Sequence, residues 1–111
     1  MADNRRDWWS YGALADQAVG SKMLNLAVNW QRYGGHGPAI HVLQQAVASL
    51  GGRVDDDGSF GPLTVNAANA LDPAALLDAI RQKALARYKA IEVAHPEDAE
   101  FFGGWEKRAL A

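Results

Sequence analysis

Cysteine is absent from all 111 residues, which excludes disulfide frameworks, thiolate nucleophiles and cysteine-ligated zinc sites. Long apolar runs are missing too, because no stretch approaches the roughly 20 apolar residues that a membrane-spanning helix needs. The first twelve residues, MADNRRDWWSYG, contain no apolar segment of the kind found in signal peptides. We therefore expect a chain that is made in the cytoplasm without a signal peptide and is not inserted into a membrane.

An excess of charge of one sign is also lacking. The 11 basic and 13 acidic side chains give a formal net charge of -2, so no broad cationic face is expected for nucleic acid or anionic lipid. Hydrophobic residues make up 49% of the sequence, which is ordinary for a globular protein. At 12.0 kDa the chain is expected to form one domain, residues 1–111, around one modest core.

Apolar residues recur at helical spacing in the first half of the chain. The first such run begins near Ala15 and ends at Trp30. The sequence YGGHGP stops it, and Pro38 suits the first turn of a second helix. Gly51 and Gly52 then end this second helix.

The second half continues the helical pattern. A short helix is expected at about residues 63–71, and Asp72-Pro73 is a favourable N-cap and first-turn pair for the longest helix. His95-Pro96 ends that helix, and a helical turn, a glycine break and a last short helix follow. The apolar face of the longest helix is expected to comprise Leu77, Ile80, Ala84, Tyr88 and Ile91. No alternating stretch argues for a sheet, so we predict an all-α fold, a small bundle of four to five helices.

The stretch VDDDGSFGPLTVNAAN, residues 54–69, permits two interpretations. Three aspartates and a glycine resemble the start of a calcium loop, but the closing position counted from Asp55 is Asn66 instead of a glutamate, and Pro62 interrupts the loop. The alternative is a structural turn in which Asp57 binds local backbone N–H groups and Phe60 fills the core. We favour the structural turn and expect it to lie beside the C-terminal GGWEKR.

Histidines offer no further metal site by their spacing. His36 and His41 fall on opposite sides of a helix start, His95 is distant from both, and no carboxylate pair completes a zinc spacing. No metal and no cofactor is therefore expected.

Several motifs together resemble the predicted peptidoglycan-binding domain at the C-terminal end of the glycoside hydrolase family 108 muramidases, the phage-type lysozymes also described as secretion activators. The motifs are the turn D-G-x-x-G-P-x-T, an adjacent arginine and tyrosine on the long helix, and an ending with proline, phenylalanine and G-W-x-x-R. The residues that carry them are Asp57, Thr64, Arg87, Tyr88, Pro96, Phe101 or Phe102, Gly104, Trp105 and Arg108. The pairs Val28-Asn29 and Leu43-Gln44 match the stretch that joins the catalytic part to this domain. By this resemblance, residues 8–50 correspond to the linking helices and residues 51–111 to the peptidoglycan-binding part.

The catalytic end of such muramidases is not present. They carry their acid glutamate in an E-G-G motif near the N-terminus, whereas the first glutamate here is Glu92, and all four glutamates fall in the last 20 residues. Glycoside hydrolysis requires a carboxylic acid that protonates the leaving oxygen. Asn25 also stands where the family tends to carry an aspartate. We therefore do not expect the chain to be an enzyme on its own.

Binding of the bacterial cell wall remains the expected function. Glycan recognition uses aromatic faces together with amides, carboxylates and arginines. The tryptophans have a structural alternative as core residues, and of the adjacent Trp8 and Trp9 one is expected to be exposed because neighbouring positions on a helix point about 100° apart. The candidate ligand-binding residues are Trp9, Asn29, Trp30, Asp57, Thr64, Arg87, Trp105 and Arg108.

Three functions stay open at this point. The first is a peptidoglycan-binding module, the second is part of a split or truncated lysozyme completed by a segment that carries the acid glutamate, and the third is a structural adaptor of a phage or secretion system that does not bind the wall. The resemblance implies a site of action in the periplasm or at the cell wall after release by a holin or a secretion system.

Overall fold

A computed structural model describes residues 13–111, apart from the side chains at positions 99–101, 105 and 106. Over this range the chain forms five α-helices and two short 3₁₀ helices, with no strand, so the predicted all-α fold is confirmed. The elements are α2 (Gln17–Asn29), η2 (Gln31–Tyr33), α3 (His36–Ser49), α4 (Pro62–Asn69), α5 (Pro73–Ala94), η3 (Pro96–Phe101) and α6 (Trp105–Leu110). None of the helices in this range has the length and apolar character needed to cross a membrane.

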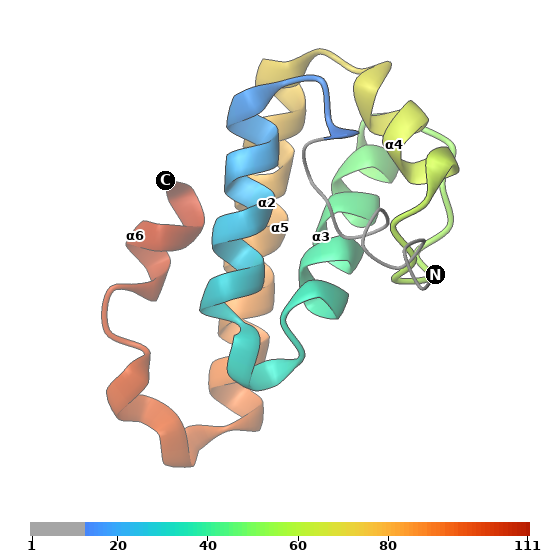
Figure 1. The fold of residues 1–111 in the computed structure, drawn as a ribbon. Helices are drawn as coiled ribbons and strands as arrows, with labels where there is room; N and C mark the ends of the chain where they lie inside the picture. Colours follow the sequence, from blue (N-terminus) through green and yellow to red (C-terminus); the bar gives the residue numbers. More distant parts are fainter. Residues whose placement is uncertain (1–12) are drawn as a thin grey trace.

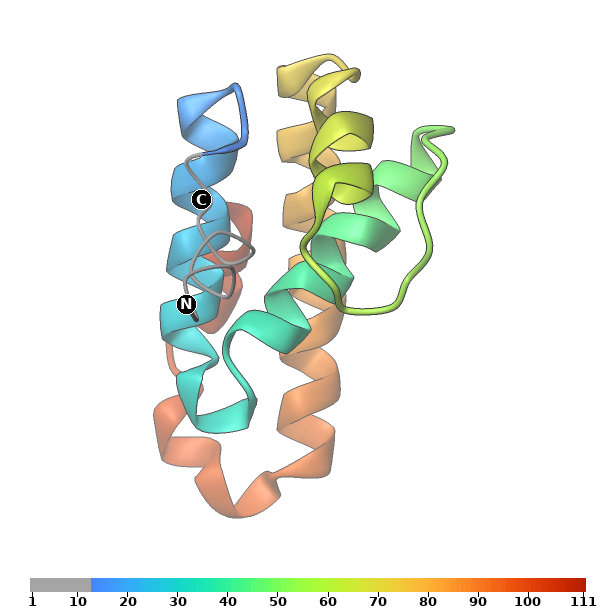
Figure 2. The same ribbon diagram turned by 45° about the vertical axis from the view of Figure 1, so that its right-hand side comes forward.

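Helices α2 and α5 run side by side, and α3 packs against both of them (Figure 1). The short helix α4 and the loop before it lie beyond α3, on one side of the bundle. After α5 the chain turns back through η3 and places α6 on the opposite side, against α5 and close to α2 (Figure 2). The predicted placement of the loop beside the C-terminal helix is therefore wrong, since α2, α3 and α5 lie between them.

Local sequence signals explain where the helices begin and end. The side chain of Asp16 accepts a hydrogen bond from the backbone N–H of Val19 at 3.0 Å and caps α2. Asp72 does the same for α5 through the N–H of Ala75 at 3.0 Å. After α3, Gly51 adopts a φ of 90°, a conformation that favours glycine. The predicted cap of the longest helix is thus confirmed.

Helix α3 forms the centre of the core, because it is covered by α2, α4 and α5. Its buried residues are Ala39, Ile40, Val42, Leu43, Gln44, Ala46 and Val47. On α5 the buried face contains Leu76 in place of the expected Leu77, which is only half-buried, while Ile80, Ala84, Tyr88 and Ile91 are buried as predicted. Trp30 and Tyr88 meet in an edge-to-face contact with ring centroids 4.9 Å apart.

Candidate functional site

The buried amide of Gln44 holds the loop between α3 and α4. The two N–H groups of its Nε2 are shared among three acceptors, namely Asp57 Oδ1 at 2.9 Å, the carbonyl of Ser59 at 3.0 Å and Thr64 Oγ1 at 3.1 Å. Its Oε1 accepts from the N–H of Gly58 at 2.9 Å. Since Gln44 is only 1% exposed, these four bonds fix the loop to the core.

The D-G-x-x-G-P-x-T motif therefore has a structural explanation. Asp57 also accepts from the N–H of Ser59 at 2.9 Å, and these hydrogen bonds, first from Ser59 and then from Gln44, lower its pKa. Gly58 has a φ of 74°, and a Cβ at this position would lie 2.8 Å from Nε2 of His41. Phe60 is 1% exposed and fills the core, as predicted. The structural-turn interpretation is confirmed in these contacts.

Asp56, which lies between Asp55 and Asp57, bonds to side chains of α3. It accepts a hydrogen bond from Nε2 of Gln45 at 3.0 Å and contacts Nδ1 of His41. The hydrogen bonds from Gln45 and His41 lower the pKa of Asp56, with a smaller contribution from the positive charge of Arg87. Arg87 on α5 is therefore close enough to this loop for its charge to act on Asp56. A hollow of about 630 Å³ lies along the loop. Of its polar residues, Asp57, Ser59 and Thr64 serve the bonds to Gln44, whereas Arg53 and Asp55 do not.

One histidine does lie beside two carboxylates, contrary to the expectation that no carboxylate pair completes a zinc spacing. Among the described residues, His95, Glu97 and Asp98 form one group of three whose possible ligand atoms lie within 4.8 Å of one another. Asp98, however, is 7% exposed and accepts from Arg32 at 3.2 Å and from the hydroxyl of Tyr33 at 2.9 Å. This group ties η3 to η2, and the guanidinium beside Asp98 opposes a second cation there.

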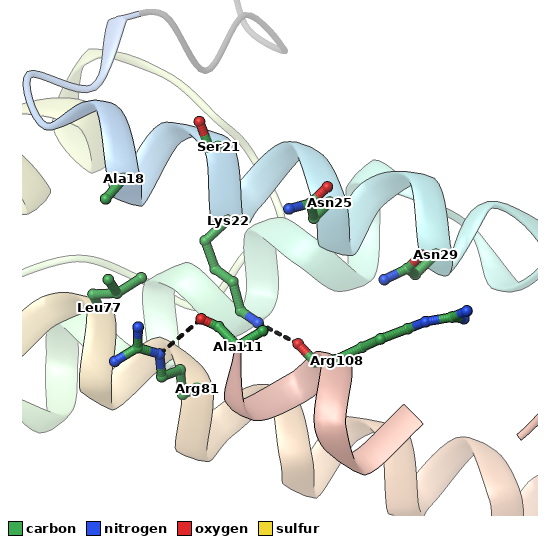
Figure 3. A pocket seen from close by; sticks show the side chains of 9 residues that line it. All are labelled: Ala18, Ser21, Lys22, Asn25, Asn29, Leu77, Arg81, Arg108 and Ala111. Atoms are coloured by element: carbon green, nitrogen blue, oxygen red, sulfur yellow. Dashed lines mark hydrogen bonds between the residues drawn. The ribbon is translucent and has the colours of Figure 1, made fainter. Parts of the chain in front are cut away.

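A cleft of about 580 Å³ lies where α2, α5 and α6 meet (Figure 3). Its walls are made of small, amide and cationic side chains. The lining residues are Ala18, Ser21, Lys22, Asn25, Asn29, Leu77, Arg81, Arg108 and Ala111. None of these nine residues has a carboxylate side chain.

Two of the cations reach the C-terminal end of α6. Nζ of Lys22 donates to the carbonyl of Arg108 at 2.5 Å, and Nε of Arg81 donates at 3.1 Å to the main-chain oxygen of Ala111, the last residue of the printed sequence. Carbonyls at a helix C-terminus lack partners within the helix and carry partial negative charge, so these bonds stabilise α6 against α2 and α5. Lys22 is 5% exposed, and burial together with the positive charge of Arg81 lowers its pKa to about 8.

Asn29 and Arg108 line the other end of the cleft, next to the buried Tyr88. Nδ2 of Asn29 donates to the hydroxyl of Tyr88 at 3.1 Å. Burial raises the pKa of Tyr88, and the hydrogen bond from Asn29 and the positive charge of Arg108 partly offset this effect. The side chain of Arg108 extends toward Asn29 and away from Arg81 (Figure 3). Arg108 is exposed and has no side-chain hydrogen bond within residues 13–111.

The predicted binding residues fall in different parts of the molecule. Asn29 and Arg108 lie together in the cleft, whereas Asp57 and Arg87 lie at the loop on the other side of the bundle. Trp9 and the side chain of Trp105 lie outside the described part of the chain.

Two of the predicted residues need correction as ligand contacts. Trp30 is 0% exposed, because its ring packs on Tyr88 inside the core. Thr64 is 2% exposed, because its hydroxyl accepts from Gln44 and donates to the carbonyl of Ser59 at 3.2 Å. Neither side chain is open to a ligand from solvent.

Ser21, Lys22, Asn25 and Arg81 also line the cleft but are not among the predicted binding residues. Ser21 and Asn25 stand at four-residue spacing with the predicted Asn29, which places small polar side chains along one face of α2. The four-residue spacing of this polar row is visible in the sequence and could have identified these positions. Lys22 and Arg81 carried no such signal, because a lone cation on a helix usually points to solvent.

Comparison with known families gives a match over residues 38–110 to the family described as predicted peptidoglycan domain. The match covers more than half of the chain. The chain belongs to this family. Neither the curated proteins nor the solved structures contain a significant match to it.

The match to the predicted peptidoglycan domain family begins inside α3, whereas the resemblance placed the peptidoglycan-binding part from residue 51 onward. It includes the loop held by Gln44 and the cleft residues of α5, together with Arg108 on α6. The α2 wall of the cleft precedes the matched residues. The cleft is therefore formed jointly by the family domain and the helix before it.

Proposed function

We propose that the chain is a cell-wall-binding module of the kind attached to family 108 muramidases, that it binds peptidoglycan in the α2–α5–α6 cleft, and that it does not cleave the polymer alone. The observation that carries this proposal is the lining of the cleft. Ser21, Asn25 and Arg108 line it, and their side chains make no hydrogen bond to any described residue. Hydroxyl, amide and guanidinium groups of this kind are suited to reading the hydroxyl, acetamido and carboxylate groups of a wall polymer.

The same lining argues against catalysis by the chain alone. A glycosidase needs a carboxylic acid beside the scissile bond, and no carboxylate side chain is found among the nine lining residues. Asn25, which stands where the resemblance expects an aspartate, lies in the cleft. The place of Asn25 in the cleft favours a second candidate function, in which the chain is part of a split or truncated lysozyme and the cleft adjoins a separate segment that carries the acid glutamate.

Co-sedimentation with purified sacculi tests the wall-binding proposal. Ser21 is exposed and lies in the wall of the cleft, so Ser21→Trp fills the cleft without disturbing the core. Ala48 is exposed on α3, a helix that does not line the cleft, and Ala48→Trp is the matched control. The parent chain and Ala48→Trp are expected to pellet with sacculi, and Ser21→Trp is expected to stay in the supernatant.

A parent chain that stays in solution would contradict the proposal and favour the structural adaptor. Equal pelleting of both tryptophan variants would place the binding surface elsewhere on the molecule. The second candidate is tested by adding a separate E-G-G-bearing segment to the chain and measuring lysis of the sacculi, which the wall-binding proposal alone does not predict. By the same proposal the site of action is the periplasm or the cell wall, reached through a holin or a secretion system.

A further inference from the structure

Three cationic side chains and no carboxylate side chain line the cleft. The main-chain carboxylate of Ala111, the last residue of the printed sequence, lies beside Arg81 and leaves Lys22 and Arg108 without a balancing charge from the nine lining residues. Lys22, Arg81 and Arg108 come from three different helices and line the same hollow. The repulsion between Lys22 and Arg81 is strong enough to contribute to the lowered pKa of Lys22. An anion bound in the cleft would relieve this repulsion, and the effect is larger in a partly desolvated site than in water.

The donors in the cleft are only partly used by the fold. Lys22 and Arg81 each use one N–H group to hold the end of α6. Arg108 differs, because its side chain lies away from Ala111, beside Asn29 (Figure 3). A guanidinium carries five N–H donors in a planar fork that matches the two oxygens of a carboxylate. Arg108 is thus the cation best placed to pair with a ligand.

The polar row on α2 complements this charge. Ser21, Asn25 and Asn29 follow one another at four-residue spacing, which corresponds to about 6 Å per step along a helix. The row therefore spans about 12 Å, the length of three to four residues of extended peptide. Amide side chains both donate and accept, which is the pattern that peptide N–H and C=O groups require.

We infer that the cleft recognises the peptide part of the wall polymer rather than its sugar chain, with Arg108 pairing with a peptide carboxylate and Asn25 and Asn29 bonding to peptide groups. The positive charges of Lys22 and Arg81 raise the local potential and favour an acidic peptide over a neutral one. This inference rests on the proposed wall binding and names its ligand class.

The test compares three ligands in calorimetric titrations with the whole chain. They are a soluble wall tetrapeptide with free carboxylates, the same peptide with its carboxylates converted to amides, and soluble glycan strands from which the peptides have been removed. We expect the acidic peptide to bind at least about tenfold more tightly than its amide, because hydrogen bonds to charged groups are about twice as strong as neutral ones. Peptide-free glycan is expected to show no binding at the same concentrations.

Two charge variants on one helix locate the contact. Arg108→Gln removes the cleft cation, and Lys107→Gln removes an exposed cation that does not line the cleft. We expect Arg108→Gln to weaken peptide binding about tenfold or more and Lys107→Gln to change it less than about twofold. Thermal unfolding of both variants checks that the fold is kept.

The outcomes separate this inference from the wall-binding proposal. Peptide-free glycan that binds as tightly as intact sacculi, or equal affinity for the acid and amide peptides, would overturn the inference and leave wall binding in place. Equal effects of the Arg108 and Lys107 variants would remove the cleft as the peptide site. Absence of binding to intact sacculi would overturn the proposed function and the inference together.

Discussion

Replacement of Gln44 by methionine is expected to release the loop between α3 and α4. Methionine keeps the length and approximate volume of the side chain but removes both polar atoms. Four hydrogen bonds are lost, namely those to Asp57, Gly58, Ser59 and Thr64. Asp57 and Ser59 are exposed and can bond to water, whereas the hydroxyl of Thr64 is buried.

The expected loss follows from these four bonds. A net contribution of about 0.5–1.5 kcal/mol for each bond gives about 2–6 kcal/mol, and access of water to two partners places the loss at about 2–4 kcal/mol. Gln45→Met is the matched control, because it makes the same chemical change one residue later. Gln45→Met removes only one exposed hydrogen bond, to Asp56, so a loss of stability of about 1 kcal/mol or less is expected.

Urea unfolding at neutral pH, analysed by linear extrapolation, measures both free energies of unfolding. The slope with urea should stay unchanged if the native state keeps its compactness. Equal losses for Gln44→Met and Gln45→Met, or a loss below about 1 kcal/mol for Gln44→Met, would refute the assignment of Gln44 as the residue that holds the loop.

Three further predictions concern titration, backbone strain and activity. Because the pKa of Lys22 is lowered from 10.5 to about 8, the folded chain loses this proton before the unfolded chain does. The free energy of unfolding should therefore rise between about pH 8 and 10.5, and the affinity for acidic peptide should fall over the same range. Urea unfolding and peptide titrations across this range measure the two quantities. A fall in the free energy of unfolding or a rise in affinity would contradict the lowered pKa of Lys22. In urea unfolding, Gly58→Ala should lower the free energy of unfolding more than Gly51→Ala. Both glycines have positive φ, which costs alanine about 1–2 kcal/mol of strain, but only at Gly58 does the new Cβ meet His41. Equal losses of stability would show that the contact with His41 is unimportant. The isolated chain should not clear peptidoglycan in a turbidity assay between about pH 4 and 8, and lysis that disappears on replacing Glu92 would show that it carries its own acid.

The helices could be predicted because their signals are local. Asp72 and the following proline indicate where α5 begins, and the glycines after α3 indicate where α3 ends. Both signals depend only on neighbouring residues. The buried face of α5 was predicted correctly except at one position, where Leu76 is buried in place of Leu77. Apolar spacing alone defines the direction of a helix face only to about one position, or 100°.

The arrangement of the helices could not be predicted in the same way. The side of the bundle that α6 occupies depends on Lys22 and Arg81, which bond to its carbonyls across 86 and 30 residues of sequence. Contacts between residues so far apart produce no periodic pattern in the sequence. The burial of Trp30 against Tyr88 is also a tertiary contact, and the sequence alone left core and platform open as alternatives.

The most direct test of peptidoglycan binding in the α2–α5–α6 cleft is a two-dimensional amide NMR titration of the chain with soluble wall fragments that carry acidic peptides. Binding in the cleft predicts that the largest shifts occur at residues that line it, including Ser21, Asn25, Asn29 and Arg108. Shifts confined to the loop at residues 52–64, or no shifts at millimolar fragment, would contradict it.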